Sequence, residues 1–84
     1  MKENDAILFM ALHADLDKIA NATTPAQIED ALYSIDTAHV LIDLLTEKYR
    51  RIEIAQILHL IARFTADGMR LEDAAVKALT IIDA

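Results

Sequence analysis

Residues 21–35, NATTPAQIEDALYSI, carry the clearest structural signal in the chain. Thr24 precedes Pro25 and is followed three residues later by Gln27, which makes a capping box with proline at the first helical position. We therefore expect a loop over residues 21–24 and a helix that begins at Pro25. Apolar residues then recur at helical spacing and predict a narrow apolar stripe along this helix. The stripe consists of Ile28, Ala31, Leu32 and Ile35.

Upstream of the loop, the pattern predicts a helix over residues 5–20, which Asn4 or Asp5 can cap. One face of this helix is aliphatic and is bordered by Phe9. That face contains Leu8, Leu12, Leu16 and Ile19. Ile7 and Met10 lie on the other side, so the first half of the helix is apolar almost all round. Such a helix must be covered on both sides.

Downstream, we expect a helix break near Asp36, with Ser34 or Asp36 capping a third helix over residues 37–50. Val40 and Leu44 lie beside the apolar stripe of that helix. A fourth helix follows from residue 52 or 53 to residue 66. No Gly or Pro separates these two helices, so one continuous helix is the alternative. Their apolar stripes would differ by about 150° in a continuous helix, and this favours a turn at residues 49–51.

Asp67 and Gly68 are expected to end the fourth helix, because glycine readily adopts the left-handed conformation that follows a helix. A fifth helix is expected over residues 71–83. The predicted fold is a single all-α domain over residues 1–84, a compact bundle of four to five short helices. Homodimerisation is one way to complete such a bundle, above all if the third and fourth helices are continuous.

The composition agrees with few, long elements. Of the 84 residues, 55% are hydrophobic, and there is one Gly and one Pro. The usual hydrophobic share is about 45–50%. Cysteine is absent, which favours a reducing compartment. No apolar run is long enough for a membrane span, and the N-terminal residues lack the basic region of a signal peptide. We therefore expect a cytoplasmic protein.

The net charge of −6 disfavours nucleic-acid binding, because contacts with phosphate groups supply most of that affinity. The one basic cluster is Lys48-Tyr49-Arg50-Arg51. We interpret it as cations in the last turn of a helix, where the helix dipole favours positive charge.

Residues suited to catalysis are scarce, so no enzymatic activity and no cofactor are expected. There is no Cys, a single Gly cannot build a phosphate-binding loop, and Ser34 is the only serine. Two His–carboxylate pairs have helical spacing, but a zinc site needs three or four ligands, so no metal is expected. These pairs are His13 with Asp17 and Asp36 with His39. Two carboxylate pairs are interpreted as first-turn charges that oppose the helix dipole. They are Glu29-Asp30 and Glu72-Asp73.

The excess of aliphatic residues leads to the main functional hypothesis, since exposed apolar patches mark interaction sites. We expect a small regulatory or adaptor protein that binds another protein or itself, as a homodimer. The candidate binding residues are Ile7, Met10, Val40, Leu44, Tyr49 and Arg50. The first alternative is an acidic inhibitor of a nucleic-acid-processing enzyme. A weaker alternative is a helix-turn-helix DNA binder built from the last two helices.

Overall fold

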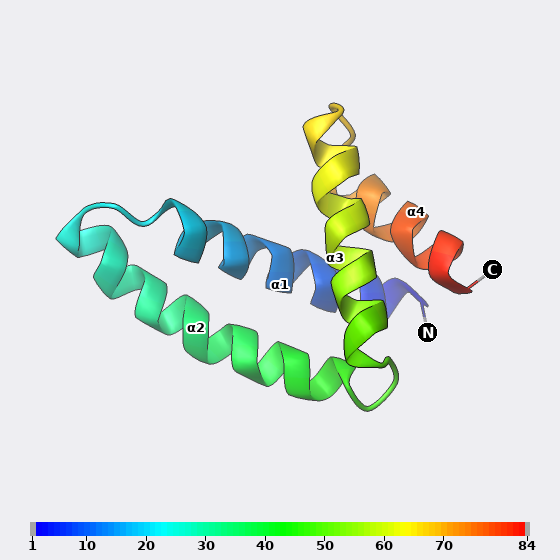
Figure 1. Cartoon of the computed structure of the whole chain (residues 1–84), viewed down its shortest axis with the longest axis horizontal. Helices are drawn as coiled ribbons and strands as arrows, with labels where there is room; N and C mark the ends of the chain where they lie inside the picture. The colour runs from blue at the N-terminus through cyan, green and yellow to red at the C-terminus, as the bar shows by residue number, and fades with distance from the viewer. Residues whose placement is uncertain (1, 84) are drawn as a thin grey trace.

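The computed structural model describes residues 2–83, and these residues form four α-helices and no strand. The helices are α1 (Lys2–Asn21), α2 (Pro25–Leu45), α3 (Arg51–Ala66) and α4 (Leu71–Asp83). Figure 1 shows α1 and α2 as an antiparallel hairpin, with α3 and α4 packed across the end of α1 that is far from the hairpin turn. The expected all-α bundle is confirmed, with four helices instead of a possible fifth.

The expected break near Asp36 is wrong, because α2 runs without interruption from Pro25 to Leu45. The capping box that starts it is present as predicted, and the Gln27 backbone N–H donates to Thr24 Oγ1 at 3.2 Å. Asp36 lies exposed in mid-helix. Its intrinsic cost in a helix is less than about 1 kcal/mol, which contacts with a neighbouring helix readily offset. The Thr37 hydroxyl oxygen lies 3.2 Å from the carbonyl oxygens of Tyr33 and Ser34 in the preceding turn, so the Thr37 side chain does not cap a new helix.

The break between α2 and α3 is confirmed, and the turn covers residues 46–50. Arg50 has an extended backbone (φ −73°, ψ 154°), and the Glu53 carboxylate accepts its N–H at 2.9 Å. This hydrogen bond holds the pKa of Glu53 below its ordinary value. Lys48 and Arg50 therefore lie in a turn, and the interpretation of the basic cluster as the last turn of a helix is wrong. α2 has no basic residue in its last turn.

Gly68 ends α3 as predicted. Its φ of 99° lies in the left-handed region that side chains disfavour. The Gly68 N–H donates to the carbonyl of Thr65, and the Met69 N–H donates to that of Phe64 at 3.0 Å. This pair of bonds is a Schellman motif, and it turns the chain sharply so that α4 packs back on α3.

The core lies where α1 meets α3 and α4. Phe9, expected only at the border of the α1 stripe, is fully buried, as is Leu12. α3 adds Ile57 and Ile61, and α4 adds small residues that allow close helix packing. Lys77 of α4 also lies 4.5 Å above the centre of the Phe64 ring. α1 packs against all three other helices, whereas α2 packs against α1 and hardly touches α3 or α4.

The core ends partway along the α1–α2 hairpin. Its buried members on α1 extend no further than Leu12, and those on α2 begin only at Ala38. The rest of the hairpin projects beyond α3 and α4, as Figure 1 shows, and the molecule is elongated, with extents of 43 × 30 × 20 Å. In this projecting part, two helices have only each other to bury apolar side chains.

We predict that Leu12→Ala lowers the free energy of unfolding by about 2–5 kcal/mol, because it leaves a cavity in the core. Ile7→Ala is the matched control on the same helix. Ile7 is 63% exposed, so its replacement should change stability by no more than about 0.5 kcal/mol. Urea unfolding followed by circular dichroism measures both values. Equal losses for the two variants would contradict the assigned core.

Candidate functional site

Up to Ala38, the buried face of α2 consists of small residues, and Leu45 is its one large buried residue. Ala31, Ser34 and Ala38 recur at i, i+3 and i+7, and all three are buried. Small residues allow two helix axes to approach closely, so they define the packing face of α2. Ser34, the only serine of the chain, is therefore part of a helix contact and is not open to a substrate.

The large aliphatic residues of the N-terminal half of α2 lie outside this contact. Ile28, Leu32 and Ile35 were expected to form the apolar stripe together with Ala31, but only Ala31 is buried. Leu32 is 58% exposed and Ile28 51%. At i, i+4 and i+7, the three side chains form a continuous row along the helix. We call Ile28, Leu32 and Ile35 the aliphatic row.

A row of carboxylates runs beside the aliphatic row. Glu29, Asp36 and Asp43 are spaced by seven residues, which is close to two helical turns, so they line up about 10.5 Å apart along the axis. All three are exposed. None belongs to an ion pair among the described side chains. We call these three residues the acidic row.

The expectation that Glu29 and Asp30 oppose the helix dipole is wrong, because α2 has no acidic residue in its first turn. The capping box sets the start of the helix at Pro25 and so places both carboxylates beyond that turn. The first turn of α4, in contrast, does contain Glu72 and Asp73. The carboxylates of α2 therefore need another explanation.

A second exposed apolar row lies on the far side of the acidic row. It contains Tyr33, Val40 and Leu44, of which Tyr33 is 75% exposed.

Val40 also lines a shallow groove between α1 and α2, together with Ala11, Asp15, Asp36, Thr37 and Leu41. The Thr37 hydroxyl donates to Asp15 Oδ2 at 2.6 Å beside this groove. The two apolar rows and the acidic row together make up what we call the outer face of α2.

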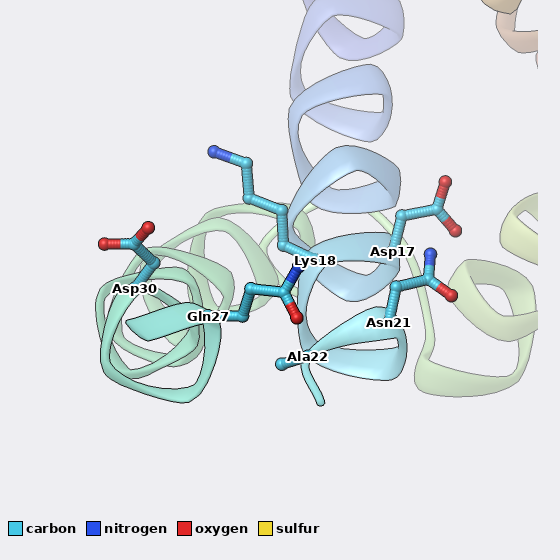
Figure 2. Close-up of a pocket in the computed structure, with 6 residues that line it drawn as sticks. All are labelled: Asp17, Lys18, Asn21, Ala22, Gln27 and Asp30. Atoms are coloured by element: carbon cyan, nitrogen blue, oxygen red, sulfur yellow. The ribbon is translucent and has the colours of Figure 1, made fainter. Parts of the chain in front are cut away.

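Two further hollows lie along the α1–α2 hairpin. One is lined by Leu32 and Tyr33 and by three carboxylates, those of Glu29, Asp30 and Asp36. The other lies at the tip of the hairpin, and Figure 2 shows its side chains. There, Gln27 is already engaged in capping, since its Oε1 accepts from the backbone N–H groups of Thr23 and Thr24. Lys18 and Asp30 project away from Asp17 and Asn21 in this view, so the tip presents no convergent set of polar groups.

The structure places the six candidate residues from the sequence in different surroundings. Val40 and Leu44 lie exposed on the outer face of α2, and Ile7 lies exposed on α1. Met10 is half-buried against the core. Tyr49 and Arg50 lie in the turn before α3, where each has a partner within the chain. Arg50 Nε is 3.3 Å from Glu53 Oε1.

Tyr49 is held by a buried carboxylate on α1. Its hydroxyl donates to Asp5 Oδ2 at 2.7 Å, Lys48 Nζ lies 3.2 Å from Asp5 Oδ1, and the Tyr49 ring packs edge-on against Phe9. Burial raises the pKa of Asp5, but the hydrogen bonds from Tyr49 and Lys48 and the charge of Lys48 outweigh it, so the pKa lies below its ordinary value. Burial and the Asp5 carboxylate raise the pKa of Tyr49 well above its usual range. This group fixes the α2–α3 turn to the start of α1.

No metal centre emerges among the side chains that the structure describes. His13 Nε2 lies 3.7 Å from Asp17 Oδ2, but no three His, Asp or Glu residues gather around one point. In the α3–α4 pair, Lys77 lies over the Phe64 ring, and the first turn of α4 carries Glu72 and Asp73.

Comparison of the chain with protein-family models, with curated proteins and with solved structures finds no match. Within residues 2–83, no helix combines the length and the apolar character needed to cross a membrane. Sequence reasoning missed the exposed aliphatic row, because the largest residues of α2 were taken as its packing stripe. The signal that could have revealed it is the repeat of small residues at positions 31, 34 and 38.

We predict that Asp5→Asn lowers the free energy of unfolding at pH 7 by about 1–3 kcal/mol, since it weakens hydrogen bonds to a buried charged group. Because the folded-state pKa of Asp5 is lowered, its contribution is present above the unfolded pKa of about 3.9 and is lost as the pH falls through the folded pKa. The difference in the free energy of unfolding between wild type and variant should therefore become smaller below about pH 4. Chemical unfolding between pH 3 and pH 7 measures it. A difference that stays constant would contradict the assignment.

Proposed function

We propose that this chain is a small acidic regulatory or adaptor protein that acts by binding another protein, and that the outer face of α2 is its binding surface. The single observation that supports this function is the position of α2. It packs mainly against α1, and its aliphatic row is left exposed beyond the end of the core. Large exposed apolar patches flanked by polar residues mark interaction sites.

Exposure of aliphatic side chains to water is unfavourable. Each aliphatic side chain that becomes fully buried contributes about 1.5–3 kcal/mol. The fold gains less than about half of this free energy from Ile28, Leu32 or Val40, because each of them is more than half exposed. A partner that covers the outer face would gain the remaining free energy of burial. A cytoplasmic location is part of the proposal, supported by the lack of cysteine.

An acidic inhibitor of a nucleic-acid-processing enzyme is the second candidate, and the unpaired carboxylates of α2 are the observation in its favour. The spacing weakens it. Neighbours in the acidic row are about 10.5 Å apart along the axis. Successive phosphates of a DNA strand are separated by a rise of about 3.4 Å. The row therefore does not reproduce the charge pattern of a duplex strand, and protein binding through the apolar rows remains our first proposal.

Photo-crosslinking in the cells that make the protein tests the proposed function. Benzoylphenylalanine in place of Leu32 lies on the outer face of α2, and in place of Val76 it lies on α4. Val76 is 47% exposed, so it is a matched position away from the proposed surface. We expect a discrete adduct from position 32 and none, or a fainter one, from position 76. This contrast is expected because only position 32 lies where a partner binds.

The mass of the adduct identifies the kind of partner. A band at twice the 9.3 kDa mass of the chain indicates self-association, and any other mass indicates a different protein. Adducts of equal yield from both positions, or none from position 32, would contradict the proposed surface.

A further inference from the structure

We propose that the partner of the outer face of α2 is an amphipathic helix whose aliphatic residues are flanked by lysine or arginine. The inference rests on the proposed function and adds the chemistry of the partner. Two independent observations carry it: the spacing of the apolar side chains and the unpaired charge between them.

The side chains of the aliphatic row have a spacing that suits binding of a helical partner. Ile28, Leu32 and Ile35 repeat at i, i+4 and i+7 on a helix of 21 residues, which is about 31 Å long. Amphipathic helices bind to such surfaces through anchors at the same spacing. The groove between α1 and α2, lined by Val40 and Leu41, continues the apolar surface around the helix. A second helix laid along the aliphatic row can bury it and bring one flank against the acidic row.

The charge of α2 determines which helix fits. Its 21 residues include four carboxylates and no Lys or Arg, and none of the four carboxylates is ion-paired among the described side chains. A partner that covered the aliphatic row would bring its own flanks against the acidic row. Acidic flanks on the partner would repel the acidic row. Uncharged flanks would remove water from its carboxylates without offering them a cation. Lysine or arginine flanks would pair with it.

The hollow beside the acidic row gives such a cation a place to lie. Three carboxylates surround it, those of Glu29, Asp30 and Asp36, and Leu32 and Tyr33 form its apolar part. A lysine or arginine has an aliphatic stem and a charged end, which matches a hollow of this composition. The exposed ring of Tyr33 can also receive a cation on its face.

A second copy of this chain fits the outer face less well. In a two-fold symmetric, antiparallel pair of α2 helices, both acidic rows come to the same edge of the interface and repel each other. In a parallel pair the rows lie at opposite edges. Neither arrangement supplies a cation from the facing helix, because α2 has none. The charge pattern thus favours a different protein over a homodimer.

Three synthetic peptides test the inference on the full chain. Each is an 18-residue helix with leucines at i, i+4 and i+7 and one tryptophan, and the flanking residues are all Lys, all Gln or all Glu. The protein contains no tryptophan, so the fluorescence of the peptide reports binding without background. Backbone amide shifts in NMR spectra of the labelled protein locate each peptide.

Two variants of equal charge change provide the control. Glu29→Gln/Asp36→Asn/Asp43→Asn neutralises the acidic row, and Glu72→Gln/Asp73→Asn/Asp83→Asn neutralises three carboxylates on α4. Circular dichroism confirms that each variant folds. At low salt, we expect the Lys peptide to bind α2 about tenfold more tightly than the Gln peptide and far more tightly than the Glu peptide. The α2 variant should remove most of this preference, and the α4 variant should keep it.

The outcomes separate the two proposals. If the Lys and Gln peptides bind α2 equally well, the inferred charge of the partner is wrong, but the outer face remains a binding surface. The same conclusion follows if both triple variants weaken the Lys peptide equally. If none of the peptides shifts the α2 amides, both the inference and the proposed surface are overturned.

Discussion

α1 is the common neighbour of the other three helices, and the arrangement of the whole molecule depends on this fact. Residues 6–12 of α1 are all apolar, so this stretch can bury side chains against α2 on one side and against α3 and α4 on another. Phe9 and Leu12 take the central positions. The second half of α1 is more polar, and no helix covers it apart from α2. The core therefore ends partway along the hairpin.

The outer face of α2 is exposed because the core ends partway along the hairpin. The small residues at positions 31, 34 and 38 turn toward α1, which leaves the larger aliphatic side chains on the flanks. A third helix over the hairpin tip would bury them, but α3 and α4 lie at the other end of α1 (Figure 1). The turn before α3 is fixed there by Tyr49 and Lys48, which bind the buried Asp5 carboxylate. Because this contact holds α3 and α4 near the start of α1, neither helix covers the tip of the α1–α2 hairpin.

Local sequence signals predicted the helix ends well. The capping box at Thr24 and the glycine at position 68 act within a few residues, and the structure has both. The phase difference between two apolar stripes correctly predicted the turn before α3. The break at Asp36 was wrong, because contact with α1 outweighs a weak local preference. The aliphatic row was missed for a related reason: α1 packs against the small residues at positions 31, 34 and 38 of α2, and not against its largest apolar residues.

The candidate surface was only partly accessible to sequence reasoning. Val40 and Leu44 were named from an excess of apolar residues, and both lie on the outer face, whereas Tyr49 is engaged in the buried group around Asp5. The sequence shows how many apolar residues the chain has, but only the packing of the helices shows which of them stay exposed to solvent. The functional proposals follow from that residue list together with the unpaired charge beside it.

The most direct test of the account is the stability of the isolated chain after the aliphatic row is removed. The variant Ile28→Gln/Leu32→Gln/Ile35→Gln replaces three large apolar residues with polar ones. Urea unfolding at two protein concentrations measures the free energy of unfolding. The account predicts a loss of no more than about 2–3 kcal/mol and no dependence on concentration, because the three side chains are only partly covered in the fold. A loss of about 4 kcal/mol or more, as expected from buried aliphatic residues, would contradict it.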